Sequence, residues 1–156
     1  MQLSLEPFYL LDENMSPSFP TVFNTCGYNM VSIQEAFDGR RQVGEPEFIP
    51  WLAQHHLHKG VWVTEDVQAQ KLHAKLISAN QISALWILTP KGGLRGIQQL
   101  QLLASVIETV NTVVVATTVP VYFQASFNIM KPKLEQLVGP LTDKNAQFKR
   151  IPLNPF

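Results

Sequence analysis

Short apolar runs alternate with amphipathic segments along the first 116 residues of the chain. Residues 8–11, 61–64 and 84–88 are runs of large or β-branched apolar side chains, which is typical of strands buried on both faces. Residues 29–33 form a shorter run of the same kind. Strands that alternate with helices favour a parallel sheet covered by helices. The pattern therefore predicts an α/β fold: a three-layer α/β/α arrangement with a mostly parallel central sheet.

Helical spacing of apolar residues separates these runs. Ser16-Pro17 predicts a helix start, and Gly27 suits the C-terminal end of that helix. A second helix follows Glu45. Pro50 fits this helix if it starts near Glu47, because amide hydrogens of the first turn are unpaired anyway. Two further helices are predicted from apolar stripes at Leu72, Leu76 and Ile77 and, most regularly, from Ile97 to Val110.

The last third of the chain has a weaker pattern. Residues 112–116 and 121–123 have the composition of strands, with Pro120 between them. A chain of 156 residues has the length of one domain. We therefore predict a single domain over residues 1–156, with a core at about 8–116 and a C-terminal tail at 117–156 of undefined structure. The tail contains Pro132, Pro140, Pro152 and Pro155.

Composition and charge narrow the class of protein. The 12 basic and 12 acidic side chains give a formal net charge of zero, which argues against coating of nucleic acid by bulk electrostatics. No run approaches the roughly 20 continuous apolar residues that span a bilayer, and Met1–Glu6 has no basic segment ahead of an apolar one. The single cysteine, Cys26, is expected to be a buried thiol. These features predict a cytoplasmic protein without a membrane segment.

Acidic residues directly follow two of the predicted strands. Asp12-Glu13-Asn14 follows residues 8–11, and Glu65-Asp66 follows residues 61–64. Functional groups of open α/β sheets gather at the carboxyl ends of the strands, so Asp12 and Asp66 are expected to lie close together. Carboxylates that meet repel one another unless a cation neutralises them. The pattern predicts a site for Mg²⁺ or Mn²⁺, which suits phosphoryl-group chemistry.

Five segments have a distinctive order and spacing. They are Leu10-Leu11-Asp12-Glu13-Asn14, Ser16-Pro17, Cys26-Gly27-Tyr28-Asn29-Met30-Val31, Glu45-Pro46-Glu47-Phe48-Ile49 and Val61-Trp62-Val63-Thr64-Glu65-Asp66. Their order resembles the PIN-like superfamily of metal-dependent ribonucleases, in particular the compact branch of bacterial toxin–antitoxin toxins related to the VapC type. The resemblance covers about residues 8–90, and it is carried by the order of the segments rather than by any one of them.

The resemblance implies a metal-dependent endoribonuclease that cleaves RNA and that an antitoxin protein neutralises, or that associates with itself. Its metal, Mg²⁺ or Mn²⁺, would be held by Asp12, Asp66 and Glu45, with Glu47 as the alternative to Glu45. The catalytic residues would be these same four acids. Supporting positions would be Glu13, Asn14, Thr64 and Glu65, and contacts with the RNA backbone would come from Arg40, Arg41, Lys71 and Lys91. Two positions depart from the family pattern: Glu45 stands where many relatives have aspartate, and Gln68 where many have a further acid.

Two other interpretations stay open. The first is a PIN-like domain that has lost catalysis and acts as a binding module through protein or nucleic-acid contacts, which the zero net charge and Gln68 favour. The second is an unrelated α/β protein whose acids only cap helices, because the helix dipole stabilises acids at helix N-termini.

Three further motifs have plain structural explanations. The group His55, His56 and His58 shows no fourth ligand for zinc. The segment 91–96 lacks the Gly-Lys-Ser/Thr ending of a P-loop and is expected to be a turn. The tryptophans, which lie in apolar runs and fit a core, are Trp51, Trp62 and Trp86.

Overall fold

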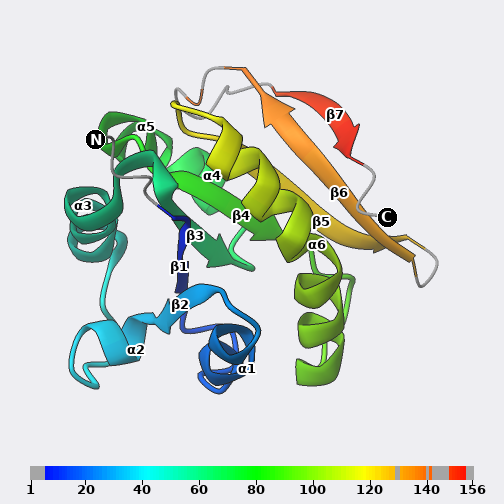
Figure 1. Cartoon of the computed structure of the whole chain (residues 1–156), viewed down its shortest axis with the longest axis horizontal. Coiled ribbons are helices and arrows are strands. Elements are labelled where there is room, and N and C mark those ends of the chain that lie inside the picture. The colour runs from blue at the N-terminus through cyan, green and yellow to red at the C-terminus, as the bar shows by residue number, and fades with distance from the viewer. Residues whose placement is uncertain (1–5, 129–130, 140, 142–147, 154–156) are drawn as a thin grey trace.

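The computed structural model describes residues 6–128, 131–139, 141 and 148–153. Within these ranges the chain forms a seven-stranded sheet in the order β2-β1-β3-β4-β5-β6-β7 (Figure 1). Strands β1 to β5 pair in parallel, whereas β6 pairs antiparallel with β5, and β7 antiparallel with β6. The strands are β1 (Phe8–Leu11), β2 (Asn29–Ser32), β3 (Gly60–Thr64), β4 (Ser83–Ile87), β5 (Tyr122–Asn128), β6 (Lys131–Val138) and β7 (Lys149–Leu153).

The prediction of a three-layer fold with a mostly parallel sheet is wrong. The sheet is mixed, and its C-terminal half, from β5 onward, is antiparallel. Pro132 and Pro152 interrupt the side-chain alternation of β6 and β7. Because proline is unusual inside a strand, the sequence pattern did not predict these two strands. Antiparallel neighbours can be joined by a short connection, so they do not require the strand–helix alternation that predicts parallel strands. The four strands predicted in the N-terminal half do form, each within one residue of its predicted bounds.

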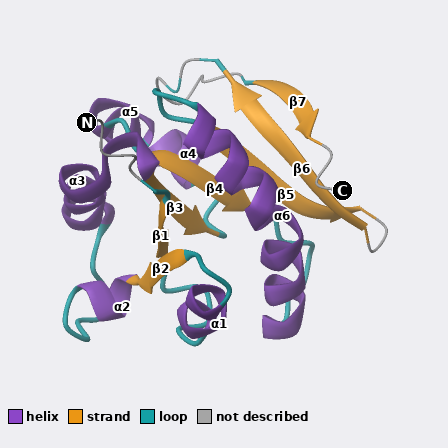
Figure 2. Ribbon diagram, viewed as in Figure 1, coloured by secondary structure: helices purple, strands orange, loops and turns teal. Residues whose placement is uncertain are grey.

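Helices cover both faces of the parallel half (Figure 2). On one face, α1 and α6 pack over a cluster that includes Tyr9, Leu85 and Phe123. On the other face, α3 and α5 pack over a cluster that includes Trp62 and Trp86, which are fully buried, as predicted. The helical segments are α1 (Phe19–Thr25), α2 (Ile33–Ala36), α3 (Glu45–His56), the 3-10 turn η1 (Leu57–Lys59), α4 (Ala69–Leu72), α5 (Ala74–Asn80) and α6 (Gly96–Ala116).

Helix α6 crosses one face of the sheet and is longer than predicted (Figure 1). The strand expected at residues 112–116 is wrong, because this segment is the last part of α6. Its β-branched residues favour a strand locally, but Val110 and Val114 are both buried one helical turn apart, and this burial decides the outcome. By length and composition α6 could cross a membrane, yet one side of it packs on the sheet, which is consistent with a soluble protein.

A buried lysine holds the end of α6. Lys59, 8% exposed, precedes β3, and its Nζ donates to the carbonyl of Val114 and to those of Val115 and Thr117 at 3.0 and 2.9 Å. The carbonyl of Val114 also accepts from the N–H of Thr117 at 3.3 Å, and the negative end of the helix dipole favours a cation at these carbonyls. The contact ties the last turn of α6 to the start of β3, one of the strands that ends in acids.

Helix boundaries differ from the sequence predictions at two places. Ser18 is the N-cap of α1, so the helix starts later than Ser16-Pro17 predicted. Helix α3 starts at Glu45, which leaves Pro50 inside the helix rather than in its first turn.

Cys26 is exposed beyond the end of α1, and the prediction of a buried thiol is also wrong, because the apolar side of this helix ends at Phe23.

The two outer strands have covered or interrupted edges. Next to β2, the side-chain amide of Asn24 accepts from the N–H of Met30 at 2.7 Å and donates to the carbonyl of Met30 at 2.9 Å. At the other edge, β7 contains Pro152, which has no N–H to offer. Both outer strands therefore offer fewer free main-chain groups than bare strands would.

Candidate functional site

The parallel pairing of β1 and β3 brings the predicted acids to one edge of the sheet. Asp12 directly follows β1, and its N–H donates to the carbonyl of Val63 at 2.9 Å, so the pairing continues to Asp12. Thr64, the last residue of β3, is its neighbour. The Thr64 hydroxyl donates to Oδ2 of Asp12 and accepts from the N–H of Asp66 at 3.0 Å. One buried hydroxyl thus joins the segments that follow the two strands.

The segments after β1 and β3 are also joined through Asn14. Its side-chain oxygen accepts from the N–H of Glu65, and its Nδ2 donates to Oγ1 of Thr64, both at 3.4 Å. The N–H of Glu13 donates to Oδ1 of Asp12 at 2.8 Å, which fixes the second carboxylate oxygen. Asn14 and Thr64 therefore orient the segments around Asp12.

The acids at this edge influence one another. The pKa of Asp12 is raised, mainly by burial, and the negative charges of Glu45 and Asp66 raise it further, while hydrogen bonds from Thr64 and Glu13 lower it. Glu45 enters the site from the first turn of α3. The charges of Glu45 and Asp66 therefore both act on Asp12, and we call these three carboxyls the acid cluster.

The acid cluster has the donor chemistry of a site for a hard divalent cation. Carboxylate and hydroxyl oxygens are what Mg²⁺ and Mn²⁺ prefer. Burial is the main cause of the raised pKa of Asp12, and a cation would offset the charges of Glu45 and Asp66 that add to it. In the part of the chain that the structure describes, no three Asp, Glu, His or Cys side chains converge closely enough to hold an ion as they stand. The donor set fits such an ion, and the side chains would have to draw closer to bind it.

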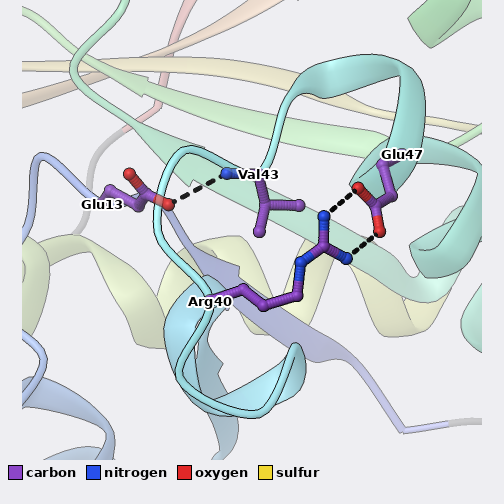
Figure 3. Close-up of polar contacts among 4 residues, drawn as sticks. All are labelled: Glu13, Arg40, Val43 and Glu47. Carbon is purple, nitrogen blue, oxygen red and sulfur yellow. Dashed lines mark hydrogen bonds and ion pairs between the residues drawn. The ribbon is translucent and has the colours of Figure 1, made fainter.

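The structure separates Glu45 from Glu47, which the sequence left as alternatives. Oε2 of Glu45 lies 3.6 Å from Nε2 of His73, and its charge acts on Asp12. Glu47 faces Arg40 instead: both terminal nitrogens of the guanidinium donate to its carboxylate (Figure 3). This pairing lowers the pKa of Glu47. Residues two apart on a helix do not share a face, so only one of them reaches the acid cluster.

The loop before α3 is held from both sides. The carboxylate of Glu13 accepts from the N–H of Val43 at 3.4 Å, and the Arg40–Glu47 pair ties the same loop to α3 (Figure 3). Arg40 is thus engaged with an acid in this structure, whereas Arg41 is exposed on the same loop.

Lys91 is exposed in the turn after β4. The N–H of Gly93 donates to the carbonyl of Pro90 there, which confirms the predicted plain turn.

Glu65 lies on the other face of the sheet from the acid cluster. Nε2 of Gln99, on α6, donates to its carboxylate. Burial raises the pKa of Glu65, and the bond from Gln99 lowers it in part. Successive residues of a strand point to opposite faces, which is why Thr64 and Glu65 diverge although they adjoin in the sequence. Glu65 therefore supports the packing of α6, and only its N–H takes part at the site.

The three histidines within α3 and just after it have structural contacts. Nδ1 of His55 lies 2.7 Å from the carbonyl of Trp51, and the ring of His56 stacks on Phe8 with centroids 3.9 Å apart. Burial lowers the pKa of His56 and of His58. His55 and His56 therefore contribute to the packing around Trp51 and Phe8.

A groove of about 750 Å³ opens beside the acid cluster, and local sequence patterns did not predict it. It runs from the segment after Asp66 to β7. Lys71 was expected to contact RNA, but no local signal marked Gln124 or Arg150, because they lie in the tail. The groove is lined by Val67, Gln68, Gln70, Lys71, Leu72, Leu88, Gln124 and Arg150.

Comparison of the chain with protein-family models, with curated proteins and with solved structures finds no match.

Proposed function

We propose that the protein is a metal-dependent endoribonuclease with a PIN-like active site, acting in the cytoplasm. The observation that carries the proposal is the acid cluster: Asp12 and Asp66, at the carboxyl ends of neighbouring parallel strands, share the Thr64 hydroxyl, and Glu45 adds a third negative charge. All three carboxyls are half-buried, and negative charges that lie near one another away from water are unfavourable for folding unless a cation, such as a divalent metal ion, neutralises them.

In this proposal the residues have distinct parts. Asp12, Asp66 and Glu45 would hold Mg²⁺ or Mn²⁺, which supplies an activated water and stabilises charge on the phosphate. Thr64 holds Asp12 in one orientation through Oδ2, and Asn14 keeps the two loops together. Glu47 and Arg40 stabilise the loop before α3 rather than the ion.

An RNA cleavage assay tests the proposal. We expect the native protein to cleave unstructured RNA in Mn²⁺ and to lose cleavage in EDTA. Asp12→Asn keeps the size of the side chain and removes its charge, so activity should fall at least about 100-fold, as expected when several kcal/mol of transition-state stabilisation are lost. Cleavage that survives EDTA, or that persists in the Asp12→Asn protein, would refute the mechanism.

Glu45 and Glu47 form a matched pair for the same assay. Both lie in the first turn of α3, and each changes by one charge on replacement by glutamine. Glu45→Gln should lose most of the activity, because it removes a member of the acid cluster. Glu47→Gln should keep it. Equal losses would place both glutamates, or neither, at the metal.

A non-catalytic binding module is the second candidate. It is favoured by the spacing of the acid side chains, which do not converge among the described residues, and by Gln68, which is not an acid. RNA binding without any cleavage by the native protein would support it. The toxin role, an antitoxin partner and self-association rest on the resemblance, and copurification with a small protein encoded nearby would test them.

A further inference from the structure

We infer that the groove between the segment after β3 and strand β7 binds the single-stranded RNA next to the phosphate to be cleaved. Lys71 and Arg150 would contact its backbone, and Gln70 and Gln124 would contact a base. The inference rests on the proposed function for the part played by the acid cluster, but the binding itself needs no catalysis.

The groove lies on the same face of the sheet as the acid cluster. In the strand register, Thr64 pairs with Trp86, and Trp86 with Gln124, so these side chains form one row across β3, β4 and β5. Gln124 is two strand spacings from Thr64, about 10 Å. The wall of the groove begins with Val67, the residue after Asp66. A strand of RNA that reaches the acid cluster therefore passes into the groove over a short distance.

The charges of the groove suit a nucleic acid. Lys71 and Arg150 are the charged residues in its lining, and both are exposed. No described acidic side chain forms an ion pair with either of them. Lysine and arginine are the side chains that most often contact phosphates. The protein has zero net charge, so this pair is a local attraction for RNA rather than part of a basic surface.

The uncharged part of the lining suits a base. Nε2 of Gln70 donates to Oε1 of Gln124 at 3.2 Å, which leaves Oε1 of Gln70 as an acceptor and Nε2 of Gln124, a residue only 4% exposed, as a donor. Such a donor and acceptor can bind the edge of an unpaired base. Leu72 and Leu88 provide an apolar wall for its face. A duplex, with its base edges already paired, lacks this match.

Strand alternation provides a matched control. Arg150 is in register with Leu137, whose side chain lies in the cluster on the groove side of the sheet. Lys149, the preceding residue of β7, therefore points to the opposite face. Both are exposed cations on one strand, so their replacement by glutamine removes the same charge from nearly the same place.

The test measures binding of a short single-stranded RNA by fluorescence anisotropy in EDTA, with all variants in an Asp12→Asn background. Lys71→Gln and Arg150→Gln should each weaken binding about five- to tenfold, and Lys149→Gln less than about twofold. Removing one phosphate-binding cation should also reduce the slope of log affinity against log salt by about 0.7. Thermal melts would show that the exposed substitutions leave the fold intact.

The outcomes separate the groove from the active site. Equal weakening by Lys149→Gln would show attraction by general charge and would overturn the inference, as would unchanged binding in both groove variants or no RNA binding at all. A native protein that binds RNA through Lys71 and Arg150 but never cleaves it would support the groove and refute the proposed catalysis. If the native protein cleaves RNA but the groove variants bind RNA normally, the proposed catalysis is supported and the inference about the groove is refuted.

Discussion

The two halves of the sheet differ in packing and in the chemistry that they carry. Every residue of β3 and β4 is buried, helices cover both faces there, and acids follow the ends of β1 and β3. In β7, by contrast, residues are mostly exposed, and the strand contributes a cation to the groove. Like charges need a rigid frame to stay together, whereas cations that bind a flexible strand of RNA need only an open surface. Under the proposed function, the division of the sheet follows this difference.

The largest expected effect tests whether stability resides in the parallel half. Leu85, in β4, is fully buried in the cluster beneath α6, whereas Ile151, in β7, is 39% exposed. Leu85→Ala should lower the free energy of unfolding by about 2–5 kcal/mol, because it leaves a cavity. Ile151→Ala should cost about 1 kcal/mol or less. Urea denaturation would measure both, and equal losses would show that the two halves are equally important to the fold.

A smaller loss of stability is expected when a lysine is replaced in each of the two halves. Lys59→Met removes the donor for three carbonyls at the end of α6 and should cost about 1–3 kcal/mol. Lys133→Met, in β6, removes a pair at 3.7 Å between a half-exposed ammonium and the Glu135 carboxylate, whose side chain is 12% exposed. It should cost about 1 kcal/mol, because water screens the lysine. Hydrogen exchange should increase in the last turn of α6 only for the first variant. Faster exchange in both variants would mean that Lys59 does not act as a local cap.

The smallest expected change in the free energy of unfolding is at Asp12, where the substitution should stabilise the protein rather than destabilise it. Because folding raises the pKa of Asp12 above the ordinary 3.8, the native state is penalised as this carboxyl ionises with rising pH. Without metal, Asp12→Asn should therefore be slightly more stable than the native protein near neutral pH, and this advantage should vanish in acid. Glu135→Gln, in the antiparallel half, should give no such gain, since Glu135 pairs with Lys133.

Thermal melts between about pH 3 and pH 7, with and without Mn²⁺, would measure this difference. Mn²⁺ should stabilise the native protein and not the Asp12→Asn protein, because only the former keeps the complete acid cluster. A variant that is less stable than the native protein at neutral pH without metal would show that the hydrogen bonds of Asp12 outweigh its charge. The comparison of the two halves would then lose its electrostatic basis.

The parallel half could be predicted because burial on both faces leaves a continuous apolar run. That pattern located β1 and β3, and the geometry of parallel strands then placed Asp12 and Asp66 at one edge. The choice between Glu45 and Glu47 could not be predicted. Glu45 and Glu47 point in directions that differ by roughly 200° around the helix, and the sequence does not show which direction faces the sheet edge. Pro50 also suggested a later helix start.

The antiparallel half and the groove could not be predicted from local patterns in the sequence. Proline breaks the alternation of β6 and β7, and the groove joins Lys71 to Arg150, which are far apart in the chain. The end of α6 was mistaken for a strand, because Val113, Val114 and Val115 are β-branched and the contact with Lys59 cannot be seen locally. Tertiary contacts, rather than local preference, decide these segments.

The side chain of Asn24 and the ring of Pro152 have a consequence for how copies of this protein meet at high concentration. A bare outer strand is a template on which another chain can add, and repeated addition leads to fibres. Asn24 occupies both main-chain groups of Met30 at one margin, and Pro152 withholds a donor at the other. Growth of the sheet from one molecule into the next is thus discouraged at both margins. The self-association proposed above would then use the helical surfaces, where it can end at a defined number of subunits.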